Sequence, residues 1–298
     1  MPDNAKSSAK QPVPVKVKKN SEILRVLKQM SYNRLALAGF IIFVTIVILL
    51  ILAPIIAPHP YTQLDLTRMH QPPSRSHWFG TDEFGRCILS RILQGGRFSV
   101  TMGVLSVSIS MSIGVVIGAI AGYSGGWKDN IIMRILDVIQ ALPGMLLIIV
   151  ISAVVGAGYF NTIIALAVNS IPHHARLLRG QILRVRTSEF VEAAQSINCS
   201  RFQIIFKHVV PNSISPLIVQ STLAVANMIV MAAALSFIGL GVQPPTPEWG
   251  AMLSGARQYI RDFPHMVIFP GLAIAITVLS LNLMGDGLRD ALDPKLKR

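Results

Sequence analysis

Six long stretches of the chain consist almost entirely of apolar residues, and this pattern limits the possible fold more than any other feature. Each is rich in Leu, Ile, Val, Ala and Met, and they cover approximately residues 35–57, 98–122, 132–155, 160–175, 217–242 and 266–286. A helix that crosses the roughly 30 Å hydrocarbon core needs about 20 apolar residues. The stretches lack the apolar–polar alternation of a barrel strand. The sequence therefore predicts an all-α, polytopic membrane protein with six transmembrane helices, the fourth of them short.

The overall composition agrees with a membrane environment. Of 298 residues, 52% are hydrophobic and only 14% are charged, and the mean hydropathy is +0.55. A soluble domain could not keep so much apolar surface away from water. The sequence contains no glycine-rich phosphate-binding loop and no nucleophile with a recognisable base partner, so we expect no enzyme, no catalytic residue and no cofactor in this chain.

The distribution of basic residues predicts the orientation. If the N-terminus is cytoplasmic, 20 of the 27 Lys and Arg residues fall in segments on the cytoplasmic side. The positive-inside rule then places both termini in the cytoplasm of a multi-pass inner-membrane protein. The same excess of cytoplasmic Lys and Arg accounts for the formal charge of +13. We interpret this charge as attraction to anionic lipid headgroups, and we expect no nucleic-acid partner.

This orientation divides the chain into five parts. We expect a cytoplasmic tail at 1–34, a first transmembrane helix at 35–57, an external loop at 58–97, a five-helix core at 98–288 and a cytoplasmic tail at 289–298. The core carries a cytoplasmic loop at 176–213. Cys87 and Cys199 then lie on opposite faces of the membrane and cannot form a disulfide with each other.

The cytoplasmic loop has the capping signals of two short helices. Ser188 is a candidate N-cap for a first helix that ends at Asn198, a residue type that tolerates the left-handed conformation. Ser200 is a candidate cap for a second helix, with Phe202, Ile205, Phe206 and Val209 on one face, and Pro211 is expected to end that helix.

This loop resembles the cytoplasmic loop of the permease subunits of bacterial ABC importers. Its residues Glu192, Ala193, Ala194 and Pro211 match the family's Glu-Ala-Ala motif and later proline, while Asn198 stands where the family has Gly. The resemblance implies that these five residues couple the chain to an ATPase subunit. The alternative is an amphipathic turn that lies on lipid.

Two further segments are similar to one branch of that family, the dipeptide, oligopeptide and nickel importers. Residues 77–91 resemble the branch's Gly-Thr-Asp, Gly-Arg-Asp and Ser-Arg signature, with Cys87 in place of the second Asp. Turn and cap chemistry by Thr81 or Asp82 explains this segment better than substrate binding does. Residues 235–295 are also similar, so the likeness to the C-type permease covers about residues 30–297.

The resemblance implies the fold and the partners. We expect the permease fold of type I ABC importers, a second permease of the B type, two ATP-binding subunits that hold ATP and Mg, and an extracytoplasmic peptide-binding protein. Short peptides are the expected substrate, and glutathione or a nickel or other metal chelate is the alternative. An ion-coupled secondary transporter and a non-transporting scaffold are more remote alternatives.

Polar and flexible residues inside the apolar stretches are candidates for a translocation pathway, because polar groups in hydrocarbon face a bundle interior or a wet cavity. The candidates are Gln220, Ser221, Asn227, Met228, Met231 and Asn282. Each could instead make a hydrogen bond between helices.

Other side chains inside or beside the stretches have structural explanations. Gly114, Gly118 and Gly122 lie on one helix face and favour tight packing. Arg134 and Asp137 are spaced to pair on one helix. His173 and His174 are adjacent in sequence, so their side chains diverge and they do not predict a metal site.

Overall fold

The computed structural model describes residues 33–292, and these residues form helices joined by loops, with no strand among them. The first 32 residues of the predicted N-terminal tail and the last six residues of the predicted C-terminal tail lie outside the described part. The long helices are α2 (Arg34–Ile51), α4 (Ile88–Ser124), α5 (Gly126–Gln140), α6 (Gly144–Val155), α7 (Tyr159–Val185), α11 (Ser215–Phe237) and α13 (His265–Leu292). The short α-helices are α3 (Ala53–Ile56), α8 (Glu189–Ser196), α9 (Arg201–Gln203), α10 (Val210–Ser213) and α12 (Trp249–Ala256). Three further turns are η1 (Leu66–Arg68), the π-helix η2 (Ile204–Val209) and η3 (Arg257–Tyr259).

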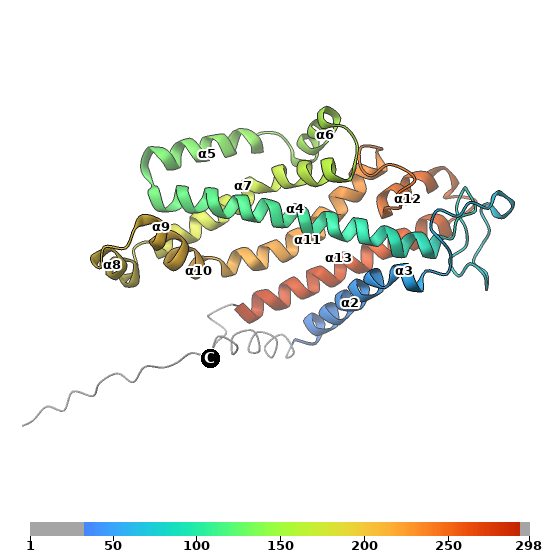
Figure 1. The fold of residues 1–298 in the computed structure, drawn as a ribbon, viewed down its shortest axis with the longest axis horizontal. Coiled ribbons are helices and arrows are strands. Elements are labelled where there is room, and N and C mark those ends of the chain that lie inside the picture. Colours follow the sequence, from blue (N-terminus) through green and yellow to red (C-terminus); the bar gives the residue numbers. More distant parts are fainter. Residues whose placement is uncertain (1–32, 293–298) are drawn as a thin grey trace, which may run out of the picture.

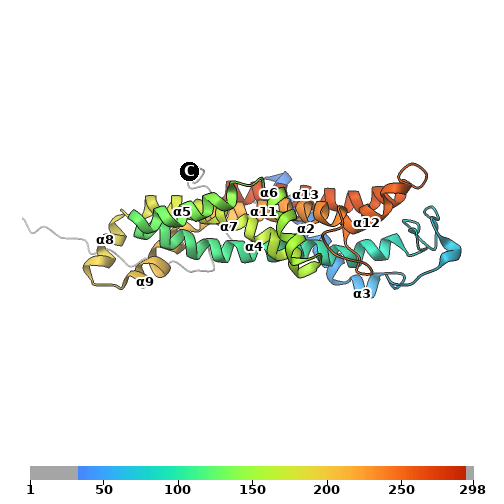
Figure 2. The ribbon, with the colours of Figure 1, turned by 90° about the horizontal axis from the view of Figure 1, so that it is seen from above.

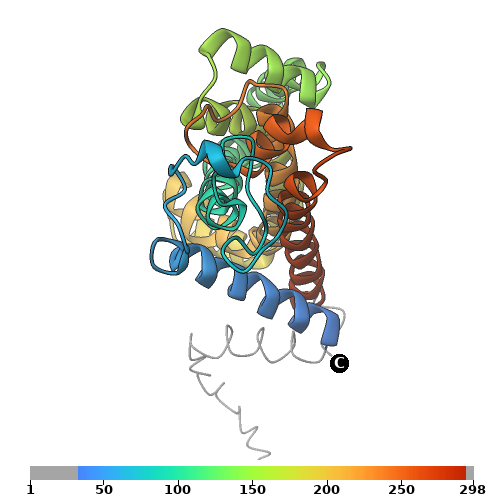
Figure 3. The same ribbon diagram turned by 90° about the vertical axis from the view of Figure 1, so that its right-hand side faces the viewer.

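Apart from α6, the long helices run roughly along one axis (Figure 1). Helix α4 occupies most of this length and packs most extensively against α7, while α13 packs against α2 and α11. The short helices α8 and α9 lie at one end, and the loop at 57–87 and α12 lie at the other (Figures 1 and 2). Viewed from that second end, α2 and the α5–α6 segment lie on opposite sides of the bundle (Figure 3).

Six separate spans are not reproduced. Within the described residues, α2, α4, α11 and α13 are long and apolar enough to cross a membrane, and α5 with α6 makes a fifth span if the bent pair counts as one. The predicted fourth span lies within α7, which continues ten residues beyond position 175. Helix α4 begins ten residues before the predicted span at 98. Hydropathy therefore located the apolar centres of the helices but missed their polar ends.

The predicted third span is broken. Helices α5 and α6 meet at an angle of 83°. Pro143 precedes α6 as its N-cap, and Ala141 caps the end of α5. Because a proline lacks the amide hydrogen and disfavours helical geometry in the residue before it, the helix stops ahead of Pro143 and restarts in a new direction.

Small residues allow α4 and α7 to approach closely. A Cβ atom added at Gly114 would lie 2.6 Å from the Cβ of His174, and one added at Gly122 would lie 3.1 Å from the Cβ of Ile182. Gly118 similarly faces the backbone of Ala175. The glycine face on α4 therefore packs tightly, as the four-residue spacing predicted.

Buried hydrogen bonds attach α12 to α4 at the end opposite α8. The Ser99 hydroxyl donates to Glu248 Oε1 over 2.8 Å and accepts from the Trp249 backbone amide over 3.2 Å. The Trp249 indole N–H donates to the Ile92 carbonyl over 3.0 Å. Glu248 and Trp249 are almost fully buried. These hydrogen bonds satisfy polar groups whose burial without a partner would cost free energy.

Candidate functional site

The loop between α7 and α11 folds as short helices at one end of the molecule (Figure 1). Ser188 precedes α8 as predicted, but its hydroxyl donates to the Val185 carbonyl over 2.6 Å and makes no capping bond to α8. Asn198 has a φ angle of 59° and so adopts the predicted left-handed conformation. The Cys199 amide donates to the Ala194 carbonyl over 3.1 Å, which closes the end of α8.

The second half of this loop differs from the prediction. Ser200 makes the expected cap, a capping box with Gln203. Pro211, however, does not end the helix: the π-helix η2 continues directly into α10, where proline stands in the first turn. Because Pro211 has no amide hydrogen, one carbonyl of the preceding π-helix loses its backbone donor at this place. Of the four residues predicted to share one face, Ile205 and Val209 are buried, whereas Phe202 is 70% exposed and its ring centroid lies 4.7 Å from that of Phe206.

Helix α8 has one buried face and one exposed face. Val191 and Ala194 are buried in a cluster that contains Leu178 and Ile182 of α7. Glu192 and Ala193 are exposed on the other side. The two alanines therefore differ in role: Ala194 packs on the chain's own core, and only Ala193 is free for contact with another molecule.

Exposed apolar side chains accompany Ala193 at this end. Ile197 is 76% exposed and Phe202 is 70% exposed, and Phe190 is 42% exposed. All three belong to the segment at 190–202 that carries Glu192 and Ala193. This end of the molecule thus exposes an acidic side chain and several apolar side chains, on and directly after a helix whose other face is buried in the chain's own core.

A cleft of about 600 Å³ opens beside the break between α5 and α6. It is formed by the break, the middle of α7 and one face of α11, and its lining residues include Gln140, Asn169, Ser170, His173, Gln220, Ala224, Asn227 and Met228. The lining contains no Asp, Glu, Lys or Arg. The cleft is therefore polar without carrying a formal charge from those residue types.

Three of the six predicted pathway residues line this cleft, namely Gln220, Asn227 and Met228. The other three do not. Ser221 is buried and its hydroxyl lies 3.3 Å from the sulfur of Met111, Met231 is half-buried on α11, and Asn282 is exposed on α13. Sequence reasoning missed Gln140, Asn169 and His173, although Pro143 inside an apolar stretch was a signal for the break beside them.

The predicted pair between Arg134 and Asp137 is wrong. Asp137 instead accepts a hydrogen bond from Arg176 of α7 over 2.9 Å, and Arg176 also donates to Gln140. Because α7 packs beside α5, an arginine of α7 pairs with Asp137 in place of the neighbour that the spacing along α5 had predicted. A second pair, Arg179 with Asp129, also joins the two helices.

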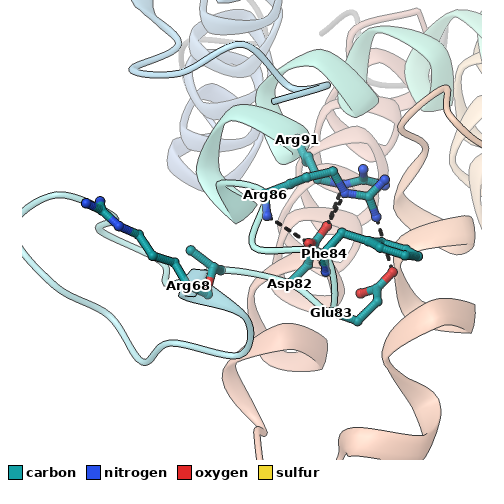
Figure 4. Close-up of polar contacts among 7 residues, drawn as sticks. Arg68, Asp82, Glu83, Phe84, Arg86 and Arg91 are labelled. Carbon is teal, nitrogen blue, oxygen red and sulfur yellow. Dashed lines mark hydrogen bonds and ion pairs between the residues drawn. The ribbon is translucent and has the colours of Figure 1, made fainter. Parts of the chain in front are cut away.

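The loop ahead of α4 holds a buried network of charges (Figure 4). The Asp82 carboxylate accepts from the Phe84 and Arg86 backbone amides, each over 2.9 Å, and from Arg86 Nε over 2.7 Å. Arg91 Nε lies 3.4 Å from the same carboxylate, and Arg86 also pairs with Glu83 over 3.2 Å. The charged side chains of this segment therefore pair with one another.

The predicted helix cap in this segment is absent. Asp82 bonds within its own turn, Thr81 forms a bridge with Cys87, and α4 begins only at Ile88. Gly85 has a φ of 70°, and an added Cβ there would collide with the Asp65 backbone. These contacts give the segment a structural role, and both Cys87 and Cys199 are free.

Two titratable groups in the same loop have shifted pKa values. Burial lowers the pKa of His77, and the nearby His59, whose ring centroid is 4.5 Å away, acts in the same direction. The Thr67 hydroxyl, which donates to the Asp65 carboxylate, lowers the pKa of that exposed group.

A bundle of apolar helices with a polar, uncharged cleft and an anchored helical loop at one end defines a membrane transport subunit. The chain belongs to the family of inner membrane components of binding-protein-dependent transport systems, whose model matches residues 114–298. Residues 21–73 also match the N-terminal transmembrane domain of oligopeptide transport permease C. The predicted resemblance to C-type permeases is therefore confirmed.

Relatives and solved structures agree with this assignment. The chain is 45% identical to the dipeptide transport system permease protein DppC of Alkalihalophilus pseudofirmus, over 91% of this chain and 89% of that protein. It is 47% identical to the glutathione transport system permease protein GsiD of Escherichia coli, over 89% and 88% of the two chains. The fold is similar to the inward-facing MetNI methionine ABC transporter, with a TM-score of 0.57 and 17% identity over 69% of this chain and 98% of that chain.

Proposed function

We propose that this chain is the permease subunit of an ATP-driven importer that carries short peptides across the inner membrane. The family membership and the 45% identity to a dipeptide permease support this substrate class. Glutathione is the second candidate, because a glutathione permease is 47% identical. Glutathione is itself a short peptide, so one kind of cleft can serve both.

The proposed assembly places this chain beside a second, B-type permease, above two ATPase subunits and below an extracytoplasmic binding protein. The ATPase subunits hold ATP and Mg. Both termini and the loop at 176–213 face the cytoplasm, since most Lys and Arg residues lie in those segments. The cleft with Gln220, Asn227 and Met228 forms this chain's part of the pathway.

The observation that carries the coupling assignment is that α8 is buried on one face and exposed on the other. Val191 and Ala194 bury one face of the helix in a hydrophobic cluster that η2 and α7 share, while Glu192 and Ala193 remain exposed. A helix held in this way moves together with the core behind it. In the proposed mechanism, closure of the ATPase pair shifts α8, and α7 carries the shift to the cleft.

A pair of substitutions at one position tests the coupling assignment. Ala193→Trp fills the surface that a close-fitting partner needs, whereas Ala193→Ser keeps it small. The complex would be purified with its neighbouring permease and ATPase subunits, and ATP hydrolysis measured with and without peptide-loaded binding protein. We expect the Trp variant to lose at least about tenfold of the peptide-stimulated rate, which corresponds to about 1.4 kcal/mol of lost contact energy, and the Ser variant to keep it.

Each part of the proposal fails on a different result. Normal stimulation in the Trp variant overturns the docking role of Ala193. Stimulation by glutathione but not by other short peptides changes the substrate. If no ATPase subunit copurifies with the wild-type chain, the importer assignment fails and an ion-coupled transporter or a scaffold takes its place.

A further inference from the structure

The cleft beside the α5–α6 break is lined by side-chain amides. Gln140, Asn169, Gln220 and Asn227 contribute one carboxamide each, from α5, α7 and α11. Gly144 at the start of α6 leaves room for one of them: an added Cβ would lie 3.0 Å from Oδ1 of Asn169. The volume of about 600 Å³ falls within the range of about 300–1,000 Å³ that small-molecule sites occupy.

Three of these amides have no hydrogen-bond partner among the residues that the structure describes. Gln140 accepts a hydrogen bond from Arg176. Among residues 33–292, the side chains of Asn169, Gln220 and Asn227 make no hydrogen bond to another protein group. Each carboxamide offers two donors and one acceptor. Asn169 and Gln220 are half-buried and Asn227 is exposed, so their free donors and acceptors face the open cleft and are available to a polar occupant.

Charged side chains lie beside the lining rather than in it, and Arg176 donates a hydrogen bond to the lining residue Gln140. The nearest ones in sequence, Arg176 and Asp137, pair with each other over 2.9 Å, and Arg179 pairs with Asp129. Both pairs satisfy their charges between α5 and α7. An occupant of the cleft therefore meets carboxamides, a hydroxyl, an imidazole and apolar groups.

A main-chain peptide group matches this lining, since it has one donor and one acceptor, the same pair that a carboxamide offers. Gln220, Ala224 and Asn227 recur on one face of α11 at intervals of four and three residues. A peptide that lies along this face could hydrogen-bond through its backbone at two levels, with its side chains directed elsewhere.

We propose that the cleft binds the transported peptide through main-chain amide groups, with Asn169, Gln220 and Asn227 as the contacts, and does not select among peptides by side-chain charge. This inference rests on the proposed function. It assigns any charge preference of the importer to other subunits.

Isosteric substitutions that add a charge test the inference. Asn227→Asp and Gln220→Glu keep side-chain size while placing a carboxylate in the lining. Asn282→Asp is the matched control, because Asn282 is exposed on α13 and lies outside the cleft. Uptake of the dipeptides Lys-Ala, Ala-Ala and Asp-Ala would be measured in proteoliposomes that contain the complete complex and its binding protein.

We expect the ratio of Lys-Ala to Asp-Ala uptake to rise at least about tenfold in either cleft variant relative to the wild type, equivalent to about 1.4 kcal/mol. The control variant should keep the wild-type ratio. Because the binding protein is the same in every sample, its own preference cancels in this comparison. Asn227→Leu should reduce uptake of all three dipeptides by the same factor.

The possible failures are distinguishable. If both cleft variants transport well and keep the wild-type ratio, the inference is overturned while the importer assignment stands. A change of the same size in the Asn282→Asp control also overturns it, because the effect would then not belong to the cleft. If the wild-type complex takes up no dipeptide, the proposed function fails first.

Discussion

Substitution of Gly118 by Ala tests whether α4 and α7 are held at their closest possible approach. The added Cβ would lie closer than 3.0 Å to the Ala175 carbonyl oxygen, a separation that real Cβ atoms essentially never show, and 3.2 Å from the Ala175 carbonyl carbon and Cα. These are backbone atoms of α7, so no side-chain rotation relieves the collision. The two helices must move apart along a contact that also contains Gly114.

Gly180→Ala provides the matched control. Gly180 lies on α7 with no atom within 4 Å of an added Cβ. Both variants gain the helix propensity of Ala over Gly, about 1 kcal/mol, so this gain cancels between them. The remaining difference is the cost of overpacking, about 1–3 kcal/mol. For a protein of this size about 1 kcal/mol corresponds to about 2–4 °C in Tm.

The assay is thermal unfolding of the purified complex in one detergent, followed by size-exclusion chromatography of the fraction that stays monodisperse. We expect the midpoint of Gly118→Ala to lie about 2–12 °C below that of Gly180→Ala. Equal midpoints, or a higher midpoint for Gly118→Ala, would refute the tight packing of α4 on α7.

Three further predictions concern the loops at the two ends. Asp82→Asn should destabilise the loop at 57–87 by about 3–5 kcal/mol, because buried Arg91 loses the carboxylate 3.4 Å away and Arg86 keeps only Glu83; faster tryptic cleavage of the loop in the intact complex would show this, and wild-type cleavage would contradict it. Asn198→Gly should stabilise the end of α8 by up to about 1 kcal/mol, because Gly accepts a φ of 59° without steric cost; hydrogen exchange in α8 should slow, and faster exchange would refute the reasoning. Burial lowers the pKa of His77 below its usual 6.5. As the pH falls through 6.5, the unfolded loop therefore binds a proton before the folded loop does, and the folded loop loses stability. Tryptic cleavage of the loop should increase between pH 7.5 and 5.5 in the wild type and much less in His77→Phe.

The parts of the fold that depend on local chemistry could be predicted from sequence. Apolar stretches located the centres of α2, α4, α11 and α13, because bilayer thickness dictates a minimum apolar length. The left-handed turn at Asn198 followed from the residue's own conformational tolerance, and the Ser200 cap from the preference of Ser for the start of a helix.

The parts that depend on distant partners could not be predicted. Helix α4 starts at Ile88 because Arg91 finds a buried carboxylate on Asp82, so polar residues that hydropathy excluded join the helix. Asp137 pairs with Arg176, which lies 39 residues away, rather than with a neighbour three residues along its own helix. The α7 side of the cleft was missed for the same reason: Asn169 and His173 reach it only because α7 passes beside the α5–α6 break.

Helix α7 connects the two candidate sites. Its residues Ser170 and His173 line the cleft, and Ile182, about two and a half turns further on, packs in the same cluster as Val191 of α8. The helix continues through Pro172 at the level of the cleft, and a proline inside a helix removes one backbone hydrogen bond and favours bending at that place. A shift of α8 therefore has a continuous, packed route along α7, and the position along this route where the helix is weakest coincides with the cleft. In the proposed mechanism, movement at the ATPase end changes the shape of the cleft at Pro172 rather than being lost along the helix.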